Sequence, residues 1–332
     1  MGSFGGDVTC SSFPKKYMPA IVTLTLHPCI DVNISVPALV PDIKMTCSQP
    51  LRQPGGGGIN VARAIHQLGG QALAVYLAGG CTGEKLGQLL ESEGVDTAPV
   101  AVPGETRENL IIREEGTGLQ YRCNLASPPM AKSTGNVLLR RLSDLKDMQW
   151  LVVSGSLAPG MTSDIFPALS AMALKNGVRL VVDTAGDALR AAVKSDVYLV
   201  KPSLHELMSL TKGRPDGSDI AARATQLLGD SKTEAVVVSL GAEGAMLVTR
   251  DTCRRFSAPR VDPVSTIGAG DSLVAGVVLS LYRGKSLPEA VGYGCLCGAA
   301  ATLHPGTGLC RLEDVNRLQQ IMEKHEKDPV DR

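Results

Sequence analysis

Residues 150–156 read Trp-Leu-Val-Val-Ser-Gly-Ser, a short apolar run that ends in small polar residues. An apolar run of this length is typical of a strand buried on both faces of a parallel sheet. Three more such runs follow, at residues 179–183, 198–200 and 235–240, and helical sequence comes after each of them. The alternation predicts an α/β fold with a doubly wound, mainly parallel sheet and helices on both faces.

The N-terminal half continues this pattern and then departs from it. Strand-like and helical segments alternate through residues 21–26, 55–68, 72–77, 82–94 and 95–102. Residues 109–112 and 120–124 instead flank a glycine-containing turn and predict a polar β-hairpin. Together with residues 28–53, which alternate without helical periodicity, this hairpin predicts a small sheet, the β-lid, built from about 28–53 and 105–125. We expect one domain over residues 20–325, a disordered extension at 1–19 and a tail at 326–332.

The charge balance excludes some classes of partner. The chain has 33 Lys and Arg and 33 Asp and Glu, so no broad basic field is available for nucleic acid or an anionic membrane. Nine cysteines without CxxC spacing predict reduced thiols and a cytoplasmic protein. Cys295 and Cys297 lie in an apolar run, where buried packing is favoured over metal binding.

The motif Ser265-Thr266-Ile267-Gly268-Ala269-Gly270-Asp271 precedes an apolar helical run at residues 272–281. Backbone amides of small residues at a helix N-terminus form a site for anions such as phosphate. A carboxylate beside that site can accept the proton of an attacking hydroxyl while the amides stabilise charge on the transferred group. The alternative is a helix start at which Asp271 only favours the dipole.

A second motif, Pro54-Gly55-Gly56-Gly57-Gly58-Ile59-Asn60, runs into the first predicted helix. It lacks the Gly-Lys-Ser/Thr of a Walker loop and the third glycine of a dinucleotide fingerprint. Asn60 is placed to hydrogen-bond sugar hydroxyls, whereas the alternative is a tight connection in which the glycines serve only the turn.

Further polar residues follow the predicted strands, at the edge where ligands bind in doubly wound sheets. They are Ser154-Gly155-Ser156, Asp183, Lys201 and residues 239–241.

In combination and in this order, the motifs resemble the PfkB branch of the ribokinase-like family over residues 20 to about 320. The segments that carry the resemblance are Thr23-Leu24-Thr25-Leu26 with Pro28 and Asp31, the four-glycine loop, Thr106-Arg107-Glu108-Asn109, Ser154-Gly155-Ser156-Leu157 and Gly268-Ala269-Gly270-Asp271. The resemblance implies a ribokinase-like kinase domain that uses ATP and Mg²⁺, with a β-lid that forms a homodimer interface. A monovalent cation such as K⁺ is a further implied cofactor.

The resemblance also implies residue roles. Asp271 would be the catalytic base, with Gly268, Ala269 and Gly270 around the transferred group. The sugar phosphate would contact Asp31, Gly56, Gly57, Asn60, Ser156, Arg107 and Lys44. The nucleotide would contact Lys201, Ser203, Ser239, Gly241, Gly244 and Thr266, and Glu206 would organise Mg²⁺ through water. Two alternatives stay open, namely that Arg107 is a solvated hairpin charge and that Asp31 is a turn residue.

The chain departs from the family pattern at three places. Ser203-Leu204-His205-Glu206 stands where the family has Asn-x-x-Glu, and by itself reads as a helix capping box. Ser265 replaces the usual Asp, and Gly306-Thr307-Gly308 has glycine where an arginine is common in the phosphofructokinase subgroup.

The expected reaction is ATP-dependent phosphorylation of fructose-6-phosphate to fructose-1,6-bisphosphate, a glycolytic step. The alternative substrates are fructose-1-phosphate and tagatose-6-phosphate, whose kinases in this branch tend to have Gly-Gly-Lys-Gly where this chain has Gly57. A non-catalytic sugar or nucleotide sensor is the alternative from a different class, and Ser203 is the feature that fits it. A nicotinamide-dependent dehydrogenase would need a glycine fingerprint at the first strand, which this chain lacks.

Overall fold

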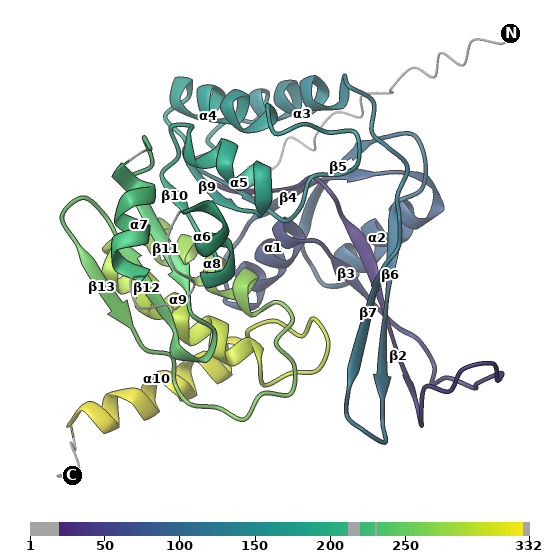
Figure 1. Cartoon of the computed structure of the whole chain (residues 1–332). Helices are drawn as coiled ribbons and strands as arrows, with labels where there is room; N and C mark the ends of the chain where they lie inside the picture. The colour runs from purple at the N-terminus through teal and green to yellow at the C-terminus, as the bar shows by residue number, and fades with distance from the viewer. Residues whose placement is uncertain (1–19, 212–219, 230, 328–332) are drawn as a thin grey trace, which may run out of the picture.

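The computed structural model describes residues 20–211, 220–229 and 231–327. The predicted extension at residues 1–19 and the last five residues of the predicted tail lie outside this part of the chain. Within it, helices cover a large β-sheet, and a second, smaller sheet extends from one side (Figure 1).

The main sheet has nine strands, and the seven from β11 to β5 are joined by parallel pairings. In spatial order they are β13 (Cys253–Phe256), β12 (Ala245–Val248), β11 (Ala235–Ser239), β10 (Leu199–Val200), β9 (Arg179–Asp183), β8 (Trp150–Ser154), β1 (Ile21–Thr25), β4 (Leu73–Ala78) and β5 (Asp96–Ala101). The antiparallel edge formed by β11, β12 and β13 was not predicted, but the doubly wound, mainly parallel sheet is confirmed.

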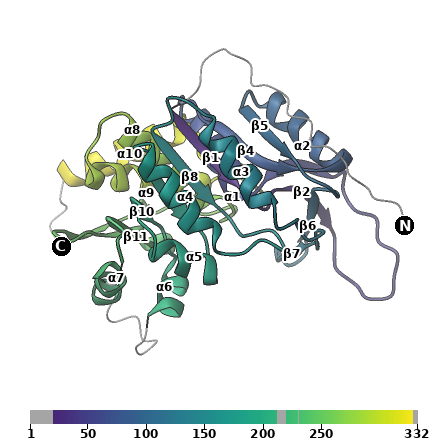
Figure 2. The same cartoon turned by 90° about the horizontal axis from the view of Figure 1, so that it is seen from above.

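Helices cover both faces of the sheet. One face holds α1 (Gly57–Gln67), α2 (Gly80–Ser92), α8 (Ala269–Tyr282), α9 (Leu287–Ala301) and α10 (Leu312–Lys327). The other holds α3 (Thr134–Ser143), α4 (Ile165–Lys175), α5 (Gly186–Val193), α6 (Leu204–Leu210) and α7 (Ile220–Gly229). In Figure 2, α2 and β5 lie at one end of the molecule, and α7 and α10 lie at the other.

Strand alternation explains the two layers. Trp150 and Val152 of β8 pack in the first hydrophobic cluster, whereas Leu151 and Val153 pack in the second, because successive side chains point to opposite faces. A strand buried on both faces needs apolar residues at every position, which is why its sequence shows no polar alternation.

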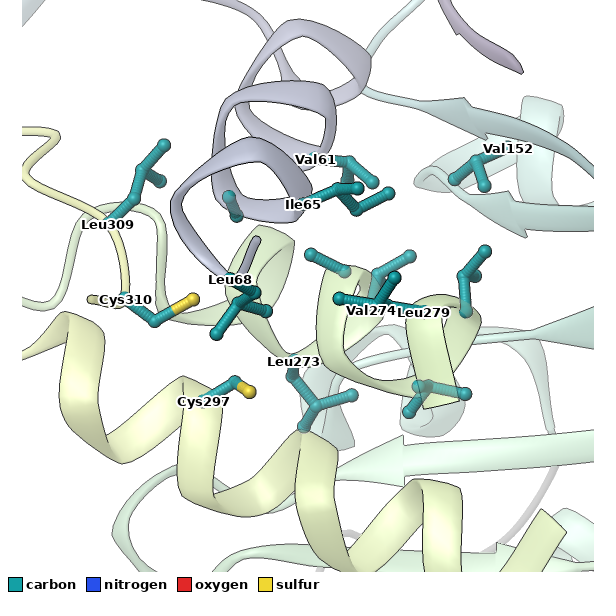
Figure 3. Packing of buried hydrophobic residues seen from close by; sticks show 14 of the residues in the cluster. Val61, Ile65, Leu68, Val152, Leu273, Val274, Leu279, Cys297, Leu309 and Cys310 are labelled. Atoms are coloured by element: carbon teal, nitrogen blue, oxygen red, sulfur yellow. The ribbon is translucent and has the colours of Figure 1, made fainter. Parts of the chain in front are cut away.

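The first cluster fixes the two helices that matter most for the site. Val61 and Ile65 of α1 lie beside Val274 and Leu279 of α8 in the same buried cluster (Figure 3). Cys297 is buried in this cluster too, as predicted. Close packing of this kind resists displacement, so the N-terminal ends of α1 and α8 are held in a fixed relation.

The predicted β-lid is a separate four-stranded sheet. Its order is β3 (Leu51–Gly55), β2 (Cys29–Val36), β6 (Arg107–Glu114) and β7 (Gln120–Asn124), and it projects from one side of the main body (Figure 1). The exact domain boundaries given from the sequence remain a prediction. None of the helices in the described part of the chain combines the length and apolar character needed to span a membrane.

Candidate active site

Asp271 is the third residue of α8, beside the helix N-terminus. Its Oδ2 accepts a hydrogen bond from Asn60 Nδ2 at 3.0 Å, and its Oδ1 accepts one from Ser154 Oγ at 3.2 Å. Burial, and next the charge of Asp183, raise the pKa of Asp271 to about 6, whereas Asn60 and Lys201 act in the opposite direction. A carboxylate with such a pKa is ionised at neutral pH and is a stronger base than an exposed one.

Glycines let the two helix starts approach each other. Gly268, the N-cap of α8, has a φ of 77°, and a Cβ there would lie 2.6 Å from Leu309 Cδ2. Gly56, the N-cap of α1, has a φ of 110°, which L side chains rarely adopt. At Gly57 a Cβ would overlap Ser154, so any larger residue there needs Ser154 to move.

A buried ion pair lies next to Asp271. Lys201 Nζ is 3.1 Å from Asp183 Oδ1, and Lys201 is only 6% exposed. Burial works against the charge of Lys201, but the Asp183 carboxylate raises its pKa and keeps it protonated. The pKa of Asp183 is raised in turn, because its burial outweighs the attraction of Lys201. Asp183 was noted in the sequence only as a strand-end residue, and its pairing depends on β9 and β10 being neighbours.

A cavity of about 530 Å³ opens over these groups, within the size range of small-ligand sites. Its lining residues are Gly57, Ser154, Gly155, Ser156, Leu157, Asp183, Thr184, Ala185, Asp187, Ala188, Glu206 and Asp271. Of the predicted site residues, it therefore joins Gly57, Ser156, Glu206 and Asp271. Ser154 was missed as a site residue, although it stands in the Ser-Gly-Ser segment that the sequence analysis placed at the end of a strand.

The lid brings a second group of predicted residues together. Asp31 is 7% exposed on β2, and its Oδ1 accepts a hydrogen bond from Asn109 Nδ2 at 3.0 Å. Because Asp31 lies inside a strand, the alternative of a turn residue is wrong. Arg107, at the start of β6, donates from Nη2 to His27 O at 3.3 Å.

Arg107 keeps part of its hydrogen-bonding capacity unused. Among the described residues, its buried Nε has no hydrogen-bond partner. Burial and then the charge of Arg107 lower the pKa of nearby His27 to about 4, so His27 is neutral at pH 7. Arg107 is therefore a cation with a free donor, a combination suited to an anionic group.

Arg122 on β7 was missed by the sequence analysis. Arg122 pairs with Ile111 of β6. Two residues earlier on β6, Asn109 pairs with Asn124 on one side and with Asp31 on the other. Directly paired residues share a sheet face, and so do residues two apart, which places Arg122 on the face that carries Arg107 and Asp31. The sequence shows that side chains alternate between the two faces along this strand. It does not show the strand register that places Arg122 on this particular face.

Most of the remaining predicted site residues do not line the cavity. Lys44 is exposed in the β2–β3 connection, and Thr266 is exposed in the segment before α8. Ser239 ends β11 and forms a bridge with Ser203. Gly241 begins the short helical turn Gly241–Glu243, and Gly244 follows it. Ser203 and Glu206 form the capping box that the sequence predicted for α6.

A family model for pfkB family carbohydrate kinases matches residues 21–314. The chain is 39% identical over 311 residues to ATP-dependent 6-phosphofructokinase isozyme 2 of Escherichia coli (strain K12), covering 92% of this chain and 100% of the relative. It is 38% identical over 310 residues to the protein of the same name from Mycobacterium tuberculosis (strain H37Rv), covering 91% and 90%. Identity to 1-phosphofructokinase of Borreliella burgdorferi is 29% over 299 residues, covering 90% and 96%.

Solved structures of phosphofructokinase-2 from Escherichia coli are similar over 92% of this chain and 100% of theirs. The complex with potassium gives a TM-score of 0.86 at 39% identity. The complex with fructose-6-phosphate and the tetrameric inhibited form each give 0.84 at 38% identity.

Proposed function

Because the chain belongs to the pfkB family of carbohydrate kinases, we propose that it transfers the γ-phosphoryl group of ATP to the free primary hydroxyl of fructose-6-phosphate. The relatives at 38–39% identity are ATP-dependent 6-phosphofructokinases, whereas the 1-phosphofructokinase is more distant at 29%. The observation that carries the proposal is Asp271, held by Asn60 and Ser154 at the start of α8 and facing the cavity.

The chemistry is a direct in-line transfer. Asp271 accepts the proton of the sugar hydroxyl, the hydroxyl oxygen forms a bond to the γ-phosphorus, and the bond from that phosphorus to the bridging oxygen of ADP breaks. The amides of Gly268, Ala269 and Gly270 stabilise charge that develops on the transferred group. Fructose-1,6-bisphosphate and ADP are the products, and no phosphoenzyme is needed.

The substrate's existing phosphate needs a cation at the other end of the site. Arg107 supports this role because it lies on the same lid face as Asp31, and Arg122 lies on that face too. Asp31 and Asn60 would hold the sugar hydroxyls, with Gly56, Gly57 and Ser156 close to the ring. Lys44 stays a predicted phosphate ligand that no contact in the structure supports.

The cavity suits Mg²⁺ carried with ATP. Asp183, Asp187 and Glu206 line it and offer the carboxylate oxygens that this ion prefers. Within the described residues no group of three acidic, His or Cys side chains converges, which fits an ion held by water, phosphates and one or two carboxylates. When bound, Mg²⁺ neutralises charge on the phosphates. Lys201, Ser203, Ser239, Gly241, Gly244 and Thr266 are the residues proposed for the nucleotide.

A monovalent cation such as K⁺ belongs to the same proposal. Ser265 Oγ donates to Gly306 O at 3.1 Å, and the buried Thr307 hydroxyl has no hydrogen-bond partner in the described part of the chain. Oxygen ligands of this kind suit a hard cation, and the relative from Escherichia coli has been solved with potassium.

The proposed reaction is tested by ADP release from ATP and Mg²⁺ with four sugars offered separately: fructose-6-phosphate, fructose-1-phosphate, tagatose-6-phosphate and unphosphorylated fructose. We expect preference for fructose-6-phosphate. Preference for another phosphorylated ketose would keep the kinase and change its substrate. No turnover with any sugar would favour the sensor alternative.

The pH dependence of kcat/KM follows from the base. Asp271 must be ionised to accept a proton, and its pKa is raised to about 6, so kcat/KM falls tenfold per pH unit below about pH 6. The substrate phosphate also titrates near pH 6, which calls for a control. Ser154→Ala removes a hydrogen bond that lowers the pKa of Asp271, so the acid limb should move upward. If the acid limb of kcat/KM does not move in Ser154→Ala, the titrating group is the phosphate of the substrate.

The Mg²⁺ requirement tests Glu206. We expect Glu206→Gln to raise the Mg²⁺ concentration for half-maximal activity by about 10-fold, the usual scale for a group that holds a metal through water. Ser203→Ala is the matched control, because it breaks the same capping box and costs about 1 kcal/mol of stability while it keeps the carboxylate. Equal Mg²⁺ requirements in both variants would limit Glu206 to helix capping.

The lid carries exposed apolar side chains that support the proposed homodimer. Leu51 on β3 is 57% exposed and Tyr121 on β7 is 40% exposed. We expect a particle of twice the chain mass of 34.8 kDa by light scattering, and a shift toward the monomer for Leu51→Asp. Leu174→Asp on α4, 58% exposed in the wild type, is the control that should leave the mass unchanged. A monomeric wild type would contradict the dimer.

A further inference from the structure

Arg63 on α1 is a buried cation that lies behind the catalytic base. It is 3% exposed, and the cavity above Asp271 is lined by other residues. Its Nε and Nη2 donate to the two carboxylate oxygens of Glu93, at 2.6 and 2.8 Å. This paired geometry satisfies one side of the guanidinium and neutralises its charge, so Arg63 acts on its other neighbours mainly through directed hydrogen bonds.

The remaining nitrogen of Arg63 faces the machinery of the site. Nη1 donates to Pro54 O at 3.0 Å and to Asn60 Oδ1 at 3.3 Å. Asn60, itself 6% exposed, then donates from Nδ2 to Asp271 Oδ2 at 3.0 Å. A continuous chain of hydrogen bonds therefore runs from Glu93 through Arg63 and Asn60 to the base.

The chemistry of the three groups permits only one orientation of the Asn60 amide. A guanidinium can only donate, and an ionised carboxylate can only accept. With the amide flipped, Nδ2 would face the donor of Arg63, and Oδ1 would face the acceptor of Asp271. Both contacts would be repulsive at a buried position, where unmade hydrogen bonds are costly.

We propose that Arg63 is a positioning residue for phosphoryl transfer, which holds the Asn60 amide so that Nδ2 always donates to Asp271. The inference rests on the proposed role of Asp271 as base. Without Arg63 the amide is free to turn, and Asp271 loses a donor that favours its ionised form. The bond to Pro54 O adds an anchor at β3, so the guanidinium ties the lid strand to the start of α1.

A double-mutant cycle on Arg63 and Asn60 separates positioning from general stability. We expect Arg63→Met to lower kcat by about 10-fold, within the scale for misplacement of a catalytic group by a distant change. Because Arg63 acts through Asn60, Arg63→Met combined with Asn60→Ala should be no slower than Asn60→Ala alone. If the fold-losses in kcat of the two single variants multiplied in the double variant, the proposal would be overturned.

Two further variants keep the test decisive. Glu93→Gln removes the charge of the same ion pair but leaves Nη1 on Asn60, so its turnover should fall clearly less than that of Arg63→Met even where its stability falls. If Glu93→Gln lost as much turnover as Arg63→Met, the effect of Arg63→Met would be due to general loss of structure and not to positioning of Asn60. Should Arg63→Met not fold, Arg63→Lys replaces it, because one ammonium on Glu93 cannot also reach Asn60; wild-type turnover in that variant would overturn the proposal.

A titration without substrate separates this inference from the proposed function. ¹³C NMR of the side-chain carboxyls, with Asp271→Asn to assign the signal, should show Asp271 titrating at higher pH in Arg63→Met than in wild type. An unchanged titration would contradict the positioning role even in an active kinase. If the Asp271 titration moved upward in Arg63→Met but the wild-type protein had no kinase activity, the positioning role of Arg63 would stand and the proposed reaction would be wrong.

Discussion

Asp271→Asn should lower kcat with fructose-6-phosphate by about 10² to 10⁴-fold, the range for loss of a positioned general base. The amide has nearly the shape of the carboxylate, and its oxygen can still accept from Asn60 while its NH2 donates to Ser154 Oγ, but it cannot take the proton of the sugar hydroxyl. Substrate binding should change little, because sugar and nucleotide contacts lie on other residues. Initial rates and equilibrium binding of ATP and fructose-6-phosphate measure the two quantities separately.

Stability distinguishes this variant from one that is merely misfolded. The folded-state pKa of Asp271 is raised from 3.8 to about 6, so the carboxyl contributes most stability below pH 3.8 and loses that contribution as the pH rises through 6. At pH 8 the neutral amide avoids the cost of a buried charge. We therefore expect the Tm of Asp271→Asn at pH 8 to equal or exceed that of wild type. Near-normal turnover in the folded variant would show that Asp271 is not the base.

Local sequence patterns were sufficient to predict the strands and helices that position Asp271. The apolar runs that became β8, β9 and β11, and the glycine-to-helix transitions at α1 and α8, depend on neighbouring residues alone. The capping box at Ser203 is also local, since its two members are three residues apart. The antiparallel β12 and β13 were not predicted, because each has only four residues and β13, Cys-Arg-Arg-Phe, lacks the apolar run of a buried strand.

The contacts around Asp271 depend on distant parts of the chain. Lys201 stays a predicted nucleotide residue; its amine pairs with Asp183, and this pairing requires β9 and β10 to be adjacent. Arg63 on α1 pairs with Glu93, which lies at the end of another helix. In each case the residue types were visible in the sequence, but the fold alone sets which of them become neighbours.

Arg107→Leu should raise the KM for fructose-6-phosphate by about 10- to 100-fold, because hydrogen bonds to charged groups contribute about 1.5–3 kcal/mol each. The guanidinium of Arg107, on the lid face that also carries Asp31, is the cation expected to meet the substrate phosphate. The kcat at saturating sugar should fall less, since the phosphate lies away from the reacting hydroxyl. Initial rates over a range of fructose-6-phosphate concentrations give both constants.

The comparison with unphosphorylated fructose decides whether Arg107 recognises the phosphate or only supports the lid. A phosphate ligand predicts that the variant loses its preference for fructose-6-phosphate while its slow rate with fructose stays unchanged. Arg113→Leu, on the exposed end of the same strand, is the matched control and should leave both rates unchanged. If Arg107 were a solvated hairpin charge, both substitutions would leave the KM for fructose-6-phosphate unaltered. If Arg107 only stabilised the lid, the two sugars would lose activity in equal proportion, because an open lid exposes the site regardless of which sugar occupies it.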